Sequence, residues 1–314
     1  MFQIRTDLAL ETREKFDEDH IEVKGVRVDE ERISPEIMIT RVFIDTENGA
    51  KAMKKPKGTY ITIEASDMME EDEDYHREIS LEIARHLQNV INLERELSIL
   101  VVGLGNSAIT ADSLGPHVVE NLHITRHMIR EYGLQSLGKE RMHRISGIIP
   151  GVMAQTGMET SEIIQGIVAE TKPDVVIAID ALAARSTRRL NRTIQITDTG
   201  INPGSGVGNH RHAINKESMG IPVIAIGIPT VVDAATIVSD TMSDLIGAMR
   251  ESAQLKSVGN GLAGLDEIEK HELARELLSP HLNAMFVTPK DIDEAVKRLS
   301  YTISEGLNLA FSRF

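Results

Sequence analysis

Two aspartates, Asp112 and Asp180, have the residue type and the spacing for acid–base chemistry. They are 68 residues apart, which is about two strand–helix units, so neighbouring strands can bring them together. Two close carboxylates cannot both ionise easily, and therefore one pKa rises while the other stays low. Such a pair supplies both a general acid and a general base. Hydrolysis of an amide by water needs both groups.

Helix capping is the competing explanation for both aspartates. Asp is a favoured N-cap residue, and Asp112 stands immediately before a helical pattern that begins at Ser113. Asp180 can cap in the same way before Ala181. Capping and catalysis are compatible, so the residue pattern leaves both roles open.

The elements that must position these residues alternate along the chain. An apolar run at 97–102 indicates a strand that is buried on both faces, and further apolar strands are expected at 174–179 and 222–228. Shorter strands are expected at 144–149 and 193–196. Helical spacing of apolar residues predicts helices at 79–93, 114–129, 160–170, 231–249, 267–278 and 290–309. This order predicts an α/β fold, with a mostly parallel twisted sheet flanked by helices.

The ends of this pattern are less regular. Residues 1–24 are polar and show little periodicity, so we expect an extended or mobile start. Apolar and polar residues alternate within 25–45 and 60–64, which predicts a small additional N-terminal β element. The Gly-rich segment 251–266 is expected to be loose and variable on the surface of a single domain.

In open α/β sheets, binding sites form outside the carboxyl ends of the strands. The loops that follow the expected strands therefore supply the candidates for substrate binding or for stabilising an oxyanion. These candidates are Gly105, Asn106, Arg185, Gly204, Ser205, Gly206, His210 and Asp233.

Other kinds of site are poorly supported. The chain has no Cys, which excludes disulfides, thiolate zinc sites and a cysteine nucleophile. The loop Gly103–Ala108 matches the dinucleotide fingerprint only in part, because Ala108 stands where the third Gly is required. His117, His123 and His127 fall on one expected helix, but position 124 is Ile, so the zinc-protease pattern is absent. We expect no metal and no cofactor.

The composition narrows the choice of partner. The formal net charge is −14, which argues against a protein that binds nucleic acid through its phosphates. It suits a neutral or basic partner. No apolar run reaches the length of a membrane span, and the N-terminus lacks the pattern of a secretory signal, so a cytoplasmic location is expected.

Several longer blocks resemble the spore germination protease family, and the resemblance extends from Arg5 nearly to the C-terminus. The blocks are Gly103–Asn106 with Thr110, Asp112 and 114–116, then 149–153, 177–186, 203–209 and 221–234. The resemblance implies an aspartic-type endopeptidase that degrades small acid-soluble spore proteins during germination. It also implies a core related to the hydrogenase maturation proteases. The two proposed catalytic aspartates of the family fall on Asp112 and Asp180.

The resemblance also concerns the N-terminus. Members of the family are made as inactive precursors that trim themselves, and the stretch Thr6–Glu11 is similar to the family's cleavage pattern. We therefore expect a cut between Asp7 and Leu8, with residues 1–7 as propeptide and residues 8–314 as the protease domain. A homotetramer located in the forespore and spore core is implied in the same way.

Three alternatives remain at this point. A hydrogenase-maturation-type endopeptidase would depend on a metal bound by its substrate. A catalytically inactive homologue would keep the fold and a degenerate site. A transferase resembling nucleoside phosphorylases is suggested only by the α/β architecture.

Overall fold

The computed structural model describes residues 8–11, 23–204, 211–265, 267–278 and 285–312. Within them, the strands form one nine-stranded sheet, with the order β1-β2-β3-β7-β8-β6-β4-β5 and with β9 paired to β8. The strands are β1 (Val26–Arg32), β2 (Ile37–Ile44), β3 (Gly58–Ala65), β4 (Ser98–Gly103), β5 (Arg144–Ile148), β6 (Val175–Ala184), β7 (Thr193–Thr197), β8 (Val223–Asp233) and β9 (Phe286–Val287).

The sheet has a parallel half and an antiparallel half. Strands β8, β6, β4 and β5 run parallel to one another. Strands β1, β2, β3 and β7 pair antiparallel, and β7 joins β8 antiparallel as well. The expected α/β class is confirmed, but the N-terminal β element is larger than expected because it continues the main sheet.

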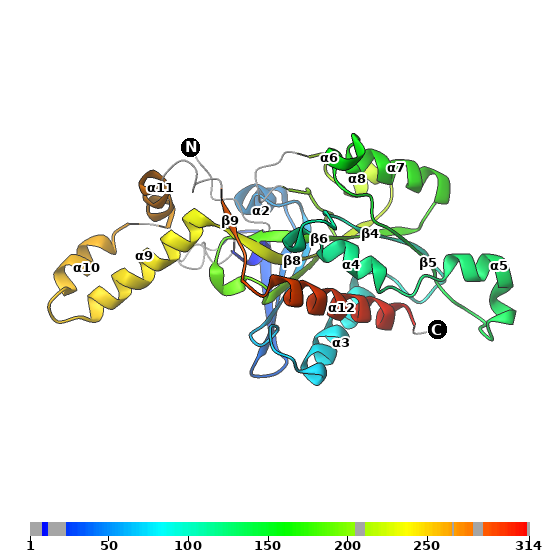
Figure 1. The fold of residues 1–314 in the computed structure, drawn as a ribbon, viewed down its shortest axis with the longest axis horizontal. Helices are drawn as coiled ribbons and strands as arrows, with labels where there is room; N and C mark the ends of the chain where they lie inside the picture. The colour runs from blue at the N-terminus through cyan, green and yellow to red at the C-terminus, as the bar shows by residue number, and fades with distance from the viewer. Residues whose placement is uncertain (1–7, 12–22, 205–210, 266, 279–284, 313–314) are drawn as a thin grey trace.

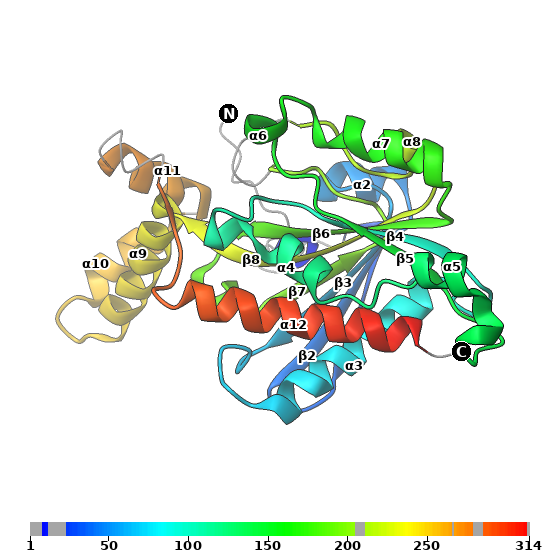
Figure 2. The same cartoon turned by 45° about the vertical axis from the view of Figure 1, so that its right-hand side comes forward.

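Helices cover both faces of the sheet (Figure 2). One face carries α3 (Glu73–Val90), α4 (Leu114–Glu120) and α12 (Ile292–Phe311), and the other carries α2 (Glu47–Met53), α7 (Thr160–Thr171) and α8 (Lys216–Met219). The other helices are the 3₁₀ turns η1 (Thr110–Asp112) and η2 (Thr187–Arg189), α5 (Arg126–Ser136), α6 (Met153–Thr156), α9 (Ala234–Glu251), α10 (Lys256–Leu262) and α11 (Glu267–Leu277). Helices α9 to α11 project beyond the sheet from the end of β8 (Figure 1).

The core follows the periodicity of each element. Along β6, Ile177 and Ile179 point into the core under α3, α4 and α12, whereas Val176 and Ala178 belong to the core on the opposite face. This alternation explains why the strand reads as a continuous apolar run. On α12, buried residues recur at helical spacing and pack against α3.

Two strands are longer than the sequence indicates. Pairing of β6 with β8 continues past 179 and 228, and its register shifts between Leu182 and Ala183. Residue 230 is skipped in the register there, next to Pro229, which has no N–H for the ladder. Helix α9 consequently begins at Ala234 instead of near 231.

The expected helix 114–129 is wrong as a single element, because it divides into α4 and α5. Asn308 of α12 accepts a hydrogen bond from the His123 N–H and donates one to the Asn121 carbonyl. These tertiary bonds replace helical bonds at the break. Helix α2 is absent from the expected elements, and α10 lies within the segment 251–266 that was expected to be loose.

The expected mobile start is wrong for residues 8–11. Leu8 and Ala9 are 0% exposed, and Glu11 is 3% exposed. Ala9 packs in a cluster with residues of β2, β3 and α2. Among the described residues, none of the helices combines the length and the apolar character that a membrane span requires.

Candidate active site

Asp112 is held by a tight loop that follows β4. Gly105 has a φ of +112°, and a Cβ there would lie 2.0 Å from the Asp112 carbonyl oxygen, so a side chain cannot be accommodated. The Asn106 N–H donates to the same carbonyl at 3.0 Å. The Thr230 hydroxyl in β8 donates to the Ala111 carbonyl at 2.6 Å. Gly105, Asn106 and Thr230 thus fix the turn that carries Asp112.

Asp180 is positioned by the sheet itself. It lies within β6, not after it, because the strand continues to Ala184. Asp180 is opposite Gly227 of β8 and is 6% exposed. One of its carboxylate oxygens accepts a 3.0 Å hydrogen bond from the Ala181 N–H. Both predicted capping roles are wrong: β6 continues past Asp180, and the N-cap position of the helix Leu114–Glu120 is Ser113, with Asp112 in the 3₁₀ turn before it.

The structure brings the two aspartates together in one pocket of about 380 Å³. The loops after β4 and β7 and the strands β6 and β8 form its walls. Gly204, Arg211 and Thr230 also line it, as do the apolar residues Ile109, Val152 and Phe286. A pocket of this size, with a few polar groups on an apolar wall, is typical of a small-molecule or side-chain binding site.

The environment of Asp112 favours its protonated form. Burial raises the pKa of the Asp112 carboxyl above its ordinary value, while a hydrogen bond from the Asn106 backbone and the charge of Arg211 act in the opposite direction. Asp112 is therefore suited to hold a proton and to donate it.

Only some of the other predicted site residues line the pocket that holds the two aspartates. Gly105 and Gly204 line the pocket, whereas Asn106 supports the Asp112 turn from outside it. The Arg185 N–H binds the carboxylate of Glu11. Asp233 caps α9 by accepting a 2.9 Å bond from the Thr236 N–H, so its predicted substrate role lacks support. Ser205, Gly206, His210 and Asp7 lie outside the described residues.

Some lining residues were not among the predicted candidates. Thr230 is marked in the sequence only by Pro229, which interrupts an apolar strand. Arg211 directly follows the Gly-rich loop, which is the signal that could have found it, and its charge acts on the carboxyl of Asp112. Phe286 comes from β9, and nothing in the local sequence indicates that this strand pairs with β8.

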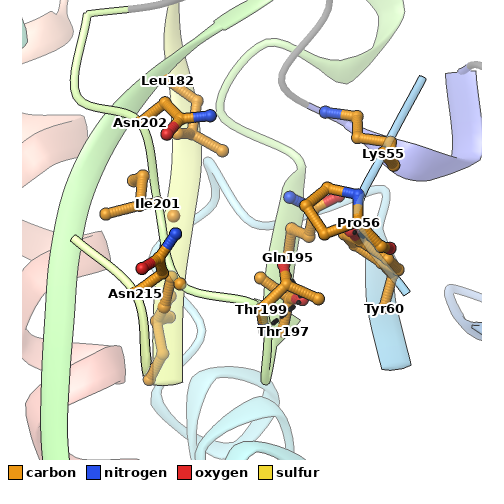
Figure 3. Close-up of a pocket in the computed structure, with 14 residues that line it drawn as sticks. Lys55, Pro56, Tyr60, Leu182, Gln195, Thr197, Thr199, Ile201, Asn202 and Asn215 are labelled. Carbon is orange, nitrogen blue, oxygen red and sulfur yellow. Dashed lines mark hydrogen bonds between the residues drawn. The ribbon is translucent and has the colours of Figure 1, made fainter. Parts of the chain in front are cut away.

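A second, smaller pocket of about 100 Å³ adjoins the aspartate pocket. Leu182 and Asn202 line both pockets. Figure 3 shows these two residues on one side of it and Gln195 and Tyr60 on the other. Burial raises the pKa of the Tyr60 hydroxyl to about 12, and this hydroxyl donates to the Pro56 carbonyl at 2.9 Å. The pocket is therefore polar and carries no titrating phenol at neutral pH.

The histidines considered as metal ligands do not share a helix. His117 lies on α4, His123 lies between the helices, and His127 lies on α5. The His117 Nδ1 atom is 2.8 Å from a carboxylate oxygen of Glu120. Among the residues that the structure describes, no group of three or more His, Asp or Glu side chains is arranged to hold a metal ion.

Comparison with known proteins agrees with a hydrolytic site. The model of the germination protease family matches residues 4–263. A germination protease of Caldanaerobacter subterraneus subsp. tengcongensis is 48% identical over 98% of this chain and 94% of its own length. One from Clostridium perfringens (strain SM101 / Type A) is 45% identical over 99% and 95%, and one from Bacillus velezensis is 41% identical over 98% and 93%.

The chain is therefore a peptidase. It belongs to the germination protease family. Among solved structures, the [NiFe] hydrogenase maturation protease HycI from Thermococcus kodakarensis KOD1 matches 46% of this chain and 80% of its own, with 21% identity and a TM-score of 0.29.

Proposed function

We propose that this protein is an aspartic-type endopeptidase that degrades small acid-soluble spore proteins during spore germination. We further propose that it is made as a zymogen that cleaves itself between Asp7 and Leu8. The observation that carries the proposal is the placement of Asp112 and Asp180 in one pocket. Membership of the germination protease family supports the substrate class.

In the proposed mechanism, Asp112 is the proton donor, because burial raises the pKa of its carboxyl, and Asp180 is the general base. Asp180 takes a proton from a water molecule, and the water oxygen adds to the carbonyl carbon of the substrate amide. Asp112 gives its proton to the carbonyl oxygen. When the tetrahedral intermediate collapses, Asp180 gives the proton that it took from water to the amide nitrogen, and the C–N bond breaks. One hydroxyl of the intermediate returns its proton to Asp112, so the products are a carboxylic acid and an amine and both aspartates regain their starting states.

The loops beside the pocket complete this proposal. The Asn106 N–H is already bonded to the Asp112 carbonyl, so it is not available to an oxyanion. Stabilisation of the negative charge that develops on the carbonyl oxygen, as Asp112 transfers its proton, therefore falls to Gly204 and to the charge of Arg211, both of which line the pocket.

The biological setting is part of the same proposal. We assign the protein to the cytoplasm of the forespore and the spore core, as a homotetramer that contacts neither nucleic acid nor membrane directly. The net charge of −14 is consistent with a neutral or basic protein substrate and with weak attraction to DNA.

The test is intact-mass spectrometry of the purified protein over time at mildly acidic pH. Loss of residues 1–7 in the wild type, but in neither Asp112→Asn nor Asp180→Asn, is the expected result. Loss in all three proteins would indicate another protease or a wrong pair. Loss that stops in a strong chelator would favour the metal-dependent alternative, and a stable wild-type mass with no cleavage of spore proteins would favour an inactive homologue.

A further inference from the structure

Residues 8–11 occupy a definite site on the sheet. They lie on the face that carries Gln195 and Tyr60, next to α2, and they are almost completely buried. The bond that we propose for self-cleavage immediately precedes Leu8. The structure therefore displays how this protein holds the peptide that follows such a bond.

The segment is held at Ala9 and at Glu11. The Ala9 N–H donates to Oε1 of Gln195 at 2.7 Å. Two residues later, the Glu11 carboxylate accepts from the Arg185 N–H at 3.2 and 3.3 Å. Nε of Arg189 is 4.0 Å from the same carboxylate. The contact at Ala9 recognises the peptide backbone, and the contacts at Glu11 recognise an acidic side chain.

The register of the sheet links this site to Asp180. Gln195 of β7 is opposite Gly227 of β8, and Gly227 is opposite Asp180 of β6. The three residues form one row across adjacent strands, and paired residues point to the same face. Two strand spacings of about 4.8 Å separate Asp180 from Gln195 by roughly 10 Å.

The middle residue of that row, Gly227, leaves space between Asp180 and Gln195. Gly227 has no side chain, and Leu182 fills the space above it, because a Cβ on Gly227 would lie 2.6 Å from the Leu182 side chain. Leu182 and Gln195 line the smaller pocket, and Leu182 also lines the aspartate pocket. The two pockets therefore adjoin each other in the region between Asp180 and the contact of Gln195 with Ala9.

We propose that Gln195, the Arg185 N–H and Arg189 form the subsite that binds the residues after the cleaved bond and selects an acidic side chain at the fourth of them. In this structure, the chain's own Leu8–Glu11 fills the subsite. A peptide substrate must displace this segment, so the processed enzyme and its substrate compete for the same groups. This inference rests on the proposed function and adds to it a preference for substrates with an acidic residue at that position.

The first experiment compares two peptides on the processed wild-type enzyme. One carries the sequence of residues 3–16 of this chain, and the other has Gln in place of Glu11. A neutral amide loses the charge-assisted contacts, so kcat/KM is expected to fall about 10- to 100-fold. Equal kcat/KM values for both peptides would overturn the subsite.

The second experiment uses Glu11→Gln in the enzyme. Self-cleavage is expected to slow about tenfold, because the segment is held less firmly in its own site. Cleavage of the Glu-containing peptide by the processed variant is expected to improve through a lower KM, because the tethered competitor is weaker. A purely structural role of Glu11 would lower both activities, and that result contradicts the proposal.

Glu82→Gln is the matched control, since Glu82 is a mostly buried carboxylate that pairs with Arg85 on α3. It should change neither activity. If wild type cleaves nothing, the proposed function fails, and the subsite is then tested by binding alone. Calorimetry on Glu11→Gln/Asp180→Asn should show the Glu peptide binding at least tenfold tighter than the Gln peptide, and equal affinities would reject the subsite.

Discussion

The Thr230 hydroxyl donates a 2.6 Å hydrogen bond to the Ala111 carbonyl, which joins the irregular part of β8 to the turn that carries Asp112. Thr230 is 0% exposed, and the Thr288 hydroxyl in turn donates to the Thr230 carbonyl at 2.9 Å. Asp112 and Asp180 belong to different elements, and β8 contacts both. The distance between the two carboxyl groups therefore depends on this strand.

Thr230→Val tests this coupling. Val keeps the shape of the side chain but leaves the Ala111 carbonyl without its donor, at a cost of about 1–3 kcal/mol. We expect cleavage of the Asp7–Leu8 bond to slow about tenfold while the protein stays folded. Mass spectrometry against time measures the rate. Thr241→Val removes a comparable bond within α9 at an exposed position and should leave the rate unchanged.

Gly105→Ala tests the close approach beneath Asp112. The added Cβ would meet the Asp112 carbonyl, and a φ of +112° is unfavourable for any residue with a side chain. We expect a loss of about 2 kcal/mol or more in unfolding free energy together with loss of cleavage. Urea unfolding and the self-cleavage assay provide the two readouts.

Gly166→Ala is the paired control, because its Cβ would meet nothing within 4 Å inside α7. Ala is the better helix former, so this variant should gain about 0.5–1 kcal/mol and cleave normally. If Gly105→Ala behaved like Gly166→Ala, the tight loop would not be what positions Asp112.

Asp112→Asn should have a stability effect that depends on pH. Because burial raises the pKa of Asp112 above 3.8, the folded state binds its proton more tightly than the unfolded chain. The stabilisation is complete below the unfolded pKa and is lost as pH rises through the folded pKa. Asn resembles the protonated acid and does not titrate. The Tm of the variant minus that of wild type should therefore become more positive from about pH 4 to pH 7.

Asp45→Asn should show the opposite trend. The Arg27 guanidinium lowers the pKa of Asp45, so its stabilisation is present at neutral pH and is lost as pH falls. The Tm difference for this variant should become more negative toward pH 7. Parallel trends for the two variants would contradict the assigned direction at Asp112.

The lowered pKa of His86 predicts that the protein loses stability in acid. Burial, with Arg85 and Arg41 nearby, lowers its pKa from 6.5 to about 4. The unfolded chain takes up the proton first, so stability from neutral His86 is present above pH 6.5 and falls toward pH 4. Urea unfolding should show the advantage of wild type over His86→Gln shrinking across this range. A constant difference would show that His86 does not titrate there.

Predictions from the sequence are most accurate for elements whose structure depends on residues close together in the chain. The central strands are recognisable because apolar residues run continuously at 99–102 and 175–179. The rule that sites lie at strand ends brought Asp112 and Asp180 forward, and the structure places both in one pocket. Asp233 shows the weakness of that rule, because a carboxylate at a strand end also suits a helix cap.

Distant contacts account for the errors. The segment 8–11 looks mobile because its partners, Arg185 and Gln195, are 174 and 186 residues away from Glu11 and Ala9. The division of the helix after α4 depends on Asn308, which is nearly as distant from His123. No local periodicity contains this information.

The burial of Leu8–Glu11 has a consequence for the substrate concentration that the proposed subsite requires. The segment remains covalently joined to the rest of the chain through Glu11, so removal of residues 1–7 does not release it. A segment that stays attached to the enzyme competes at an effective concentration on the order of millimolar. Within the proposed subsite, a dilute peptide would lose this competition, and the enzyme would turn over fast only where its substrate is densely packed.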